Sequence, residues 1–345
     1  MHGQAASPEE AGRDLRELPK AELHLHLLGA MRGATLNELA VEAGFRAPDP
    51  RAFMTFAEFQ EVFQAAFAAT QTRPENLVRL VREVVADAAA DGVVWVQPHF
   101  DPHIYPQFGA PEQVMELVLA EGLAAADRHG VGFGVTIAAM RHRGPESAED
   151  LARFAAAYAG QGVYALGLTG DEDAFPPGPF ARAFAIAREA GLAAAPHAGE
   201  LAGPDSVRAA VNDLGATRIA HGVRAVEDPA LLADLAGRDV TLDVCLTSNK
   251  ALGVFPDTSR HPLPALMAAG VGCSLGADDP LMFGAGLLDE YETARSELGF
   301  SDRQLAALAR TSIRTSGAPA STVAAAMADI DAWLGRPATI TTTSS

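Results

Sequence analysis

Two histidines two residues apart, His24 and His26, are the first residues of this chain that could do chemistry. They lie in a run of alternating apolar and polar residues, 21–27, which predicts a strand with two different faces. On such a strand both imidazoles point to one side, and the leucines between them point into the core. Two neutral imidazoles held side by side are half of a zinc or iron site. The alternative is an ordinary strand with two polar positions.

Further histidines and carboxylates follow apolar runs that predict strands: Asp171 and Glu172, His197 and Glu200, His221, and Asp278 with Asp279. In a parallel barrel, the C-terminal ends of the strands form one face, and this face carries the chemistry. Taken singly, each histidine also fits a core position and each aspartate fits a helix cap. Taken together with the histidine pair, they predict a metal site. His99 ends another predicted strand and could line the same mouth.

The elements that must position these residues alternate regularly along the chain. Strands are expected over 21–27, 93–100, 131–138, 163–168, 192–196, 217–220, 240–245 and 271–276. Helices are expected over 35–43, 111–130, 147–160, 179–191, 206–215, 228–237, 262–270 and 286–298, with caps at Thr35 and Ser147. Eight strand–helix units predict an α/β fold, a TIM (β/α)8 barrel. Two extra C-terminal helices, 301–315 and 321–334, are expected to cap it.

A helical insertion over 53–90 is expected after the first strand. Within it Phe56, Phe59, Phe63 and Phe67 recur every three or four residues and form one apolar stripe. The stripe is either an ordinary core face or a lid whose aromatic rings cover a bound ligand. The sequence leaves both interpretations open.

Length and composition limit the remaining possibilities. The chain has 345 residues, of which 48% are hydrophobic, and a net charge of −18. This charge argues against nucleic acid and anionic membranes as partners. We expect one domain over 17–336, a flexible arm over 1–16 and a disordered tail over 337–345. The absence of a signal-like or membrane-spanning segment and the two core-type cysteines favour the cytoplasm, and the sequence does not indicate an oligomeric state.

The chain resembles the adenosine deaminase family of the metal-dependent amidohydrolase superfamily. The matching motifs occur in the family's order and cover roughly residues 17–320: AELHLHLLG at 21–29, TGDE at 169–172, HAGE at 197–200, IAHG at 219–222, CLTSN at 245–249 and DDP at 278–280. The resemblance implies one Zn²⁺, with Fe²⁺ or Mn²⁺ as alternatives, held by His24, His26, His197 and Asp278. Three imidazoles and a carboxylate are ligands that suit this ion.

The resemblance also implies catalytic roles for Glu200, His221 and Asp278. Glu200 would protonate N1 of a purine while a water activated by the metal attacks C6, and ammonia would leave. His221 would orient that water, accept its proton and stabilise the developing charge, and Asp278 could share the proton. The implied activity is zinc-dependent hydrolytic deamination of a 6-aminopurine nucleoside.

The resemblance implies several contacts with this small-molecule purine nucleoside. Asp279 would bond N7 of the base, and the backbone N–H of Gly170 would meet N3, where a side chain would obstruct the ring. Phe59 and Phe63 would correspond to the family's lid, which keeps bulk water away. Leu28 occupies the position where relatives have a carboxylate that bonds the ribose 5′-hydroxyl, and leucine cannot accept this bond.

Because Leu28 replaces the carboxylate of relatives, the sequence does not identify the substrate. Either another group satisfies the 5′-hydroxyl, or the substrate is a 5′-substituted adenosine such as aminofutalosine. Free adenine is a second enzymatic reading, because it needs no sugar contact. A non-catalytic purine-binding barrel is an alternative of another class.

Smaller departures concern the surroundings of the site. Gln97 and His99 replace a glutamate and an arginine of relatives, and Gly167 replaces an aspartate. Arg32, Arg141 and His142 follow predicted strand ends. They could meet an anionic substrate tail, but an exposed, solvated charge is the simpler expectation for each.

Overall fold

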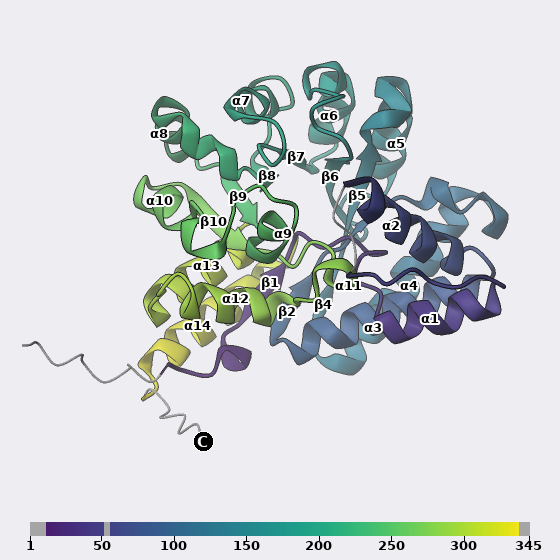
Figure 1. Cartoon of the computed structure of the whole chain (residues 1–345), viewed down its shortest axis with the longest axis horizontal. Helices are drawn as coiled ribbons and strands as arrows, with labels where there is room; N and C mark the ends of the chain where they lie inside the picture. Colours follow the sequence, from purple (N-terminus) through teal and green to yellow (C-terminus); the bar gives the residue numbers. More distant parts are fainter. Residues whose placement is uncertain (1–11, 52–55, 338–345) are drawn as a thin grey trace, which may run out of the picture.

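Parallel strands in a ring, each followed by helices on the outside, form the fold of this chain (Figure 1). The structure is a computed structural model that describes residues 12–51 and 56–337. The strands in chain order are β1 (Lys20–Glu22), β2 (Val93–Val96), β3 (His99–Phe100), β4 (Gly132–Phe133), β5 (Val135–Met140), β6 (Val163–Thr169), β7 (Ala193–Ala198), β8 (Arg218–His221), β9 (Thr241–Val244) and β10 (Gly272–Leu275).

Two of the barrel strands are broken in the middle. β2 and β3 are separated by Gln97 and Pro98, and β4 and β5 by Gly134. One set of paired strands runs β1-β2-β4, and the other runs β10-β9-β8-β7-β6-β5-β3, with parallel pairing throughout. Joining the broken pieces gives the eight barrel strands expected from the sequence, within the described ranges.

The ring is completed by the chain just beyond β1. His26 pairs with His99, and Leu25 pairs with Asp278 beyond the end of β10. The His26 amide donates to the carbonyl of Asp278 at 2.9 Å, and the Asp278 amide donates to the carbonyl of His24 at 2.8 Å. The expected TIM barrel is therefore confirmed, and candidate site residues lie on its closing seam.

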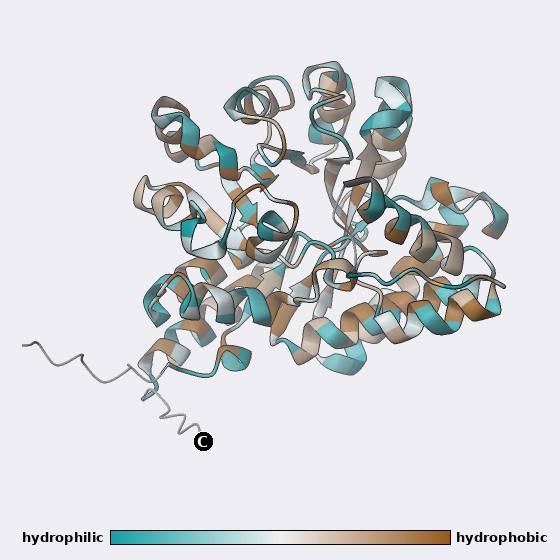
Figure 2. Cartoon of the chain, in the orientation of Figure 1, coloured by the Kyte–Doolittle hydropathy of each residue, from teal (hydrophilic) through white to brown (hydrophobic). Residues whose placement is uncertain are grey.

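The helices that surround the barrel are α1 (Gly33–Glu42), α2 (Phe56–Thr70), α3 (Pro74–Ala90), α4 (Pro111–His129), α5 (Gly144–Ala157), α6 (Ala181–Glu189), α7 (Pro204–Asn212), α8 (Pro229–Gly237), α9 (Leu246–Ala251), α10 (Leu263–Ala268), α11 (Pro280–Phe283), α12 (Leu287–Ser296), α13 (Asp302–Arg314) and α14 (Ala320–Gly335). Figure 2 shows hydrophilic and hydrophobic residues on the same helices, as expected for helices with one face on a sheet. No helix in the described part of the chain is both long and apolar enough to cross a membrane.

Several element boundaries differ from those expected. The first strand ends at Glu22, so His24 and His26 lie in the irregular segment after it. α1 begins at Gly33, and Thr35 is not its cap because its hydroxyl donates to Glu83 at 2.7 Å. The short helices α9 and α11 were not expected.

The segment before β1 contacts the C-terminal helices. The Arg13 guanidinium donates to Asp302 at 2.7 Å and to the carbonyl of Leu334 at 2.8 Å. The indole of the buried Trp333 donates to the carbonyl of Asp14 at 2.8 Å. Of the arm and tail expected from the sequence, residues 1–11 and 338–345 lie outside the described part of the chain.

Candidate active site

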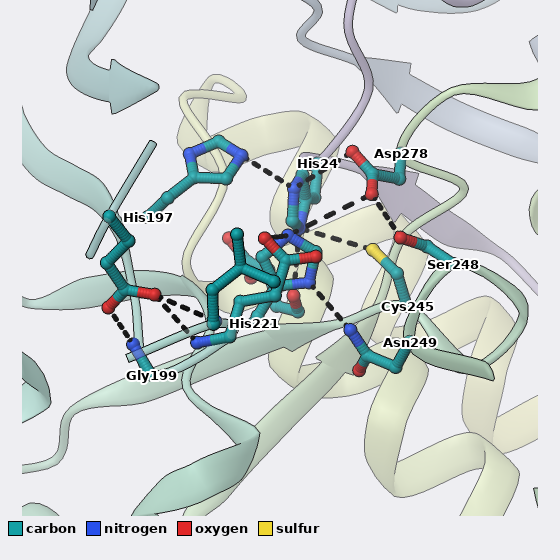
Figure 3. Close-up of polar contacts among 12 residues, drawn as sticks. His24, His197, Gly199, His221, Cys245, Ser248, Asn249 and Asp278 are labelled. Carbon is teal, nitrogen blue, oxygen red and sulfur yellow. Dashed lines mark hydrogen bonds and ion pairs between the residues drawn. The ribbon is translucent and has the colours of Figure 1, made fainter. Parts of the chain in front are cut away.

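Four side chains from distant parts of the chain converge on one point at the C-terminal end of the barrel. His24 and His26 follow β1, His197 lies in β7 and Asp278 follows β10. One ligand atom of each lies within 4.8 Å of the others. The Nε2 atom of His197 is 3.1 Å from Nε2 of His24 and 3.2 Å from Nε2 of His26. Figure 3 shows His197, His24 and Asp278 turned toward one another.

The spacing of these atoms fits a tetrahedral cation. Ligand atoms at about 2.0–2.1 Å from a tetrahedral ion lie about 3.3–3.4 Å apart. Besides the two Nε2 separations above, the Oδ1 atom of Asp278 is 3.5 Å from Nε2 of His24 and 3.3 Å from Nε2 of His26. Three imidazole nitrogens that face one another this closely repel unless a proton or a cation lies between them. The four residues therefore fit a single metal ion.

Neighbouring groups fix the orientation of these candidate ligands. The Nδ1 atom of His24 donates to the carbonyl of Asp243 at 2.9 Å, which leaves its Nε2 lone pair directed at the cluster. The Ser248 hydroxyl donates to Oδ2 of Asp278 at 2.6 Å (Figure 3). Asp278 also has a φ of 58°, a left-handed conformation that non-glycine residues rarely adopt and that recurs at functional sites.

The four candidate ligands differ in the direction in which their surroundings shift their pKa values. Burial lowers the pKa of His24, and burial holds the pKa of His197 well below its ordinary value, so both rings are neutral. Burial alone would lower the pKa of His26, but Asp279 and Asp278 raise it to about 8. Burial would raise the pKa of Asp278, but its hydrogen bond to His26 and the adjacent His24 hold it below its ordinary value.

A second set of potential ligands overlaps the first. Cys245 lies 3.2 Å from Nδ1 of His24, and together with His221 and Asp278 these residues also form a compact group. Burial raises the pKa of the Cys245 thiol well above its ordinary value, which disfavours the thiolate that a metal requires. The set with three histidines and Asp278 is therefore the better candidate.

Glu200 lies beside the cluster, and its carboxyl side chain is 13% exposed. Its Oε2 atom is 3.4 Å from Nε2 of His221, and its buried Oε1 atom has no hydrogen-bond partner in the structure. Burial raises the pKa of Glu200 well above its ordinary value, and the nearby carboxylates of Asp278 and Glu172 add to this effect. A neutral acid with one free oxygen can donate a proton to a ligand.

The loop that carries Glu200 is held by a buried carboxylate, Glu172. Its oxygens accept hydrogen bonds from four consecutive backbone amides, those of Gly199, Glu200 (3.1 Å), Leu201 (3.0 Å) and Ala202 (3.1 Å). The Ser206 hydroxyl donates to the same carboxylate. Glu172 thus supplies acceptors that no strand or helix provides to this loop.

His221 lies deeper, between Glu200 and Asp278. Its Nε2 atom is 3.9 Å from Oδ2 of Asp278, and its Nδ1 atom contacts the Asn249 amide at 3.2 Å (Figure 3). Its φ of 64° is again in the left-handed region. Burial holds the pKa of His221 well below its ordinary value, so the ring is neutral.

Asp279 is a second buried acid at the site. Its side chain occupies the space beside Gly29, where an added Cβ would lie 1.7 Å from the Asp279 carboxyl. Burial raises the pKa of Asp279 well above its ordinary value, and its buried Oδ1 atom has no hydrogen-bond partner in the structure. A protonated Asp279 can donate to a ring nitrogen such as N7, as its predicted role requires.

Two of the predicted substrate-contacting residues, Leu28 and Phe63, line one small cavity beside the cluster. The cavity measures about 50 Å³ and is lined among others by His26, Leu28, Phe63, His99 and Thr169. Gly170, the next residue along the chain, has a φ of 102° that favours glycine. Leu28 therefore lines the same cavity as the candidate ligand His26.

The phenylalanines of the predicted stripe differ in their surroundings, and some pack in the core whereas one lines the cavity. Phe63 lines this cavity, whereas Phe67 packs edge-on against Tyr105. Phe59 stacks on Phe283 at 5.7 Å. The side chain of Phe56 lies outside the described part of the structure.

The residues that depart from the family pattern adapt to one another. Gln97 bonds within the barrel, since its amide donates to Thr136 at 2.9 Å and its carbonyl accepts from Trp95 at 3.2 Å. His99 is buried at the mouth, as predicted, and its Nδ1 atom has no partner in the structure. A Cβ at Gly167 would touch the His99 ring at 3.6 Å, so the glycine leaves room for it.

The expectation that Arg141 is exposed is wrong. Arg141 is completely buried and donates to the carbonyls of His197 (2.6 Å) and Phe175. Burial lowers its pKa to about 10, which leaves it charged at neutral pH. Arg32 instead forms a partly exposed ion pair with Asp87 at 2.6 Å.

Three supporting residues, Ser248, Asn249 and His261, had no role predicted from the sequence, although the first two lie within the CLTSN motif at 245–249. Their proximity to motif residues was the available signal, because groups that orient a ligand tend to sit beside it. The partners across the barrel could be found only from coordinates.

Comparison with known proteins agrees with the geometry. The adenosine deaminase family model matches residues 19–333. A Streptomyces virginiae protein that carries the provisional name adenosine/adenine deaminase is 46% identical over 337 residues, covering 94% of this chain and 99% of that protein. An adenine deaminase of Chelativorans sp. is 37% identical over 302 residues, covering 86% and 93%. An aminodeoxyfutalosine deaminase of Acidothermus cellulolyticus is 34% identical over 303 residues, covering 84% and 85%.

Solved structures of deaminases and an amidohydrolase also superpose on this chain. The adenine deaminase of Arthrobacter aurescens superposes with a TM-score of 0.84 at 31% identity, covering 92% of this chain and 99% of that one. An amidohydrolase of Burkhoderia ambifaria with bound Zn has a TM-score of 0.81 at 27% identity, covering 93% of each chain. The Arabidopsis protein ADAL, complexed with IMP, has a TM-score of 0.82 at 25% identity, covering 92% and 97%.

Proposed function

The chain belongs to the adenosine deaminase family, a family of metal-dependent hydrolytic enzymes, and from this we propose that it deaminates a 6-aminopurine with the aid of one zinc ion. The observation that carries the proposal is Glu200, whose pKa is raised and whose buried Oε1 atom has no partner in the structure, beside a cluster that fits a tetrahedral ion. The reaction replaces the amino group by oxygen and releases ammonia.

The proposed ion would be held by His24, His26, His197 and Asp278. When bound, zinc supplies Lewis acidity that makes a water molecule nucleophilic near neutral pH. Asp278 keeps its charge at the site because its pKa is held low by its hydrogen bond to His26 and by the adjacent His24, against the opposing effect of burial. Its Oδ2 atom, bonded to Ser248, is oriented to accept a proton.

Proton donation to the ring is assigned to Glu200. Its raised pKa keeps a proton on the carboxyl at neutral pH, and delivery of this proton to N1 makes C6 electrophilic. Asp279, whose pKa burial also raises, would donate to N7 from the neighbouring position when protonated. The two buried acids thus match two acceptor nitrogens of the purine ring.

We infer that free adenine is the preferred substrate. The small cavity beside the cluster is lined among others by Leu28 and Phe63. Leu28 on its wall cannot bond a 5′-hydroxyl. The adenine deaminases among the relatives and solved structures support the same choice.

A 5′-substituted adenosine is the second candidate. Leu28 offers an apolar wall to a substituent that has lost its hydroxyl, and one relative is named an aminodeoxyfutalosine deaminase. Adenosine itself has the least support, because its hydroxyl would lose a hydrogen bond worth about 1.5–3 kcal/mol when the partner is charged.

The test is ammonia release by the zinc-loaded protein from adenine, adenosine and a 5′-deoxy-5′-substituted adenosine. Glu200→Gln keeps the shape of the side chain but removes its acidic proton, and we expect it to lower kcat by about 10²–10⁴-fold. Glu189→Gln, at an exposed position in α6, is the matched control and is expected to keep wild-type kcat. Release from adenosine in preference to adenine would contradict the substrate inference. Unchanged kcat in Glu200→Gln would contradict the role of Glu200.

A further inference from the structure

A chain of hydrogen bonds leads from a backbone amide to the back of His221. The Leu263 amide lies 3.2 Å from Nδ1 of His261, and Nε2 of His261 lies 3.1 Å from Oδ1 of Asn249. The other end of the Asn249 amide, Nδ2, lies 3.2 Å from Nδ1 of His221 (Figure 3). The three side chains are buried, so no bulk water competes for these bonds.

The polarity of this chain is fixed at its start. A backbone N–H can only donate, so Nδ1 of His261 must be a bare acceptor. The proton of the neutral His261 ring is then on Nε2, which donates to the Asn249 carbonyl oxygen. Burial lowers the pKa of His261 to about 3, which agrees with a neutral ring at physiological pH.

The same reasoning extends to His221. With its oxygen accepting from His261, Asn249 presents its NH₂ group to Nδ1 of His221, and that nitrogen must also be a bare acceptor. The single proton of a neutral His221 is therefore on Nε2. This nitrogen is the one that faces the site, 3.4 Å from Oε2 of Glu200 and 3.9 Å from Oδ2 of Asp278.

We propose that Asn249 and His261 are positioning residues that hold His221 in the tautomer with its proton on Nε2. His221 then presents an N–H donor to the site and stabilises negative charge on the oxygen that attacks C6, instead of taking a proton from it. The proton goes to Asp278, whose Oδ2 atom lies 3.9 Å from Nε2 of His221 and accepts from the Ser248 hydroxyl. This assignment rests on the proposed deaminase function for its chemistry, but the tautomer itself rests on the hydrogen bonds alone.

The test reads the ring nitrogens directly. Zinc-loaded protein labelled with ¹⁵N in its histidines is measured by NMR, where protonated and bare ring nitrogens have well-separated shifts, and His221 is assigned by its loss in His221→Gln. We expect a protonated Nε2 and a bare Nδ1 in the wild type. A proton on Nδ1 would overturn the proposal.

Asn249→Asp is the decisive variant. A carboxylate can only accept, so the proton of His221 should move to Nδ1 and leave Nε2 bare. We expect kcat for ammonia release to fall about 10–100-fold, a typical effect of removing an outer partner, with a smaller change in KM. If His221 kept its proton on Nε2 in this variant, the proposed positioning role of Asn249 would be contradicted. A moved proton with unchanged kcat would contradict the donor role.

His261→Gln is the matched conservative variant. A glutamine amide can accept from Leu263 and donate to Asn249 just as the neutral His261 ring does, so the wild-type tautomer and kcat should be retained. If folded His261→Gln protein lost the wild-type tautomer of His221, the proposed chain of hydrogen bonds would be contradicted. If the wild type releases no ammonia from any 6-aminopurine, the proposed function fails. The nitrogen shifts of His221 still decide whether Asn249 and His261 fix its tautomer.

Discussion

At the scale of single residues, His26 differs from the other candidate ligands in its protonation. Its pKa is raised to about 8 by Asp279 and Asp278 against the opposing effect of burial, so below pH 8 the metal-free ring carries a proton. A metal can bind only the neutral ring, and this proton must leave when the metal binds.

We therefore predict that zinc binding by the metal-free protein releases about one proton per ion at pH 7, and that zinc affinity falls as the pH is lowered below 8. Calorimetry in buffers with different ionisation enthalpies counts the protons. His26→Gln removes the titrating group and is the control for the pH dependence, at the cost of affinity. Zinc binding with no proton release at pH 7 would contradict the raised pKa.

The chemistry of single residues was the part of the site that the sequence could predict best. His24, His197 and Asp278 meet because each lies at or just beyond the C-terminal end of a strand of one parallel barrel, and the strand–helix alternation is visible in the sequence. Arg141 shows the limit of this reasoning. It follows a strand end like the others, but its side chain turns inward to the carbonyl of His197, and nothing in the local pattern distinguishes that from exposure.

At the scale of elements, the segment between β7 and α7 depends on a group from the preceding strand–helix unit. Glu172 follows β6 and accepts the amide hydrogens of residues 199–202. Arg141, which follows β5, holds the carbonyl of His197 in the same stretch. Two buried charges of opposite sign thus fix a candidate ligand and the proposed acid.

We predict that Glu172→Gln mobilises this loop, because an amide presents one acceptor oxygen in place of two charged ones. The free energy of unfolding should fall by about 2 kcal/mol or more. Amide hydrogen exchange should accelerate in a peptide covering residues 199–202.

Ser206→Ala is the control for this prediction, since it removes one donor and leaves the Glu172 carboxylate and its four amide bonds in place. Its exchange at residues 199–202 should stay close to wild type. Equal exchange in Glu172→Gln and wild type would show that the loop is held by other contacts.

Element boundaries were harder to predict than element order. Thr35 looked like a helix cap, but its hydroxyl bonds Glu83 on α3, a tertiary partner that local spacing cannot indicate. α5 begins at Gly144 because Pro145 already fits the first turn, ahead of the expected cap at Ser147. α9 is six residues long and too short to show a helical period.

At the scale of the whole molecule, the barrel closes where the candidate ligands lie. Leu25 pairs with Asp278, and the backbone bonds of this seam belong to His24, His26 and Asp278 themselves. An ion bound there would connect the first and last barrel strands through side chains as well.

We predict that removing the metal with a chelator lowers the midpoint of thermal unfolding, because only the folded barrel brings the four ligands together. At free metal one hundred times Kd, the contribution is about 2.7 kcal/mol. Circular dichroism during heating measures it.

Asp278→Asn, which loses one ligand charge, is the matched variant for this prediction. The difference between its chelated and metal-loaded midpoints should be smaller than in the wild type. A wild-type midpoint that does not respond to the chelator would show that the ion, if bound, does not bridge the seam.

The distance along the chain between His24 and Asp278 has a consequence for biosynthesis. The imidazole pair leaves the ribosome early, whereas the carboxylate that completes the cluster follows only after most of the barrel has been translated. A nascent chain can therefore offer an incoming ion only two of the four cluster ligands until His197 emerges. Selection of the correct metal, and its retention, is then a late event that coincides with the last strand docking against the first.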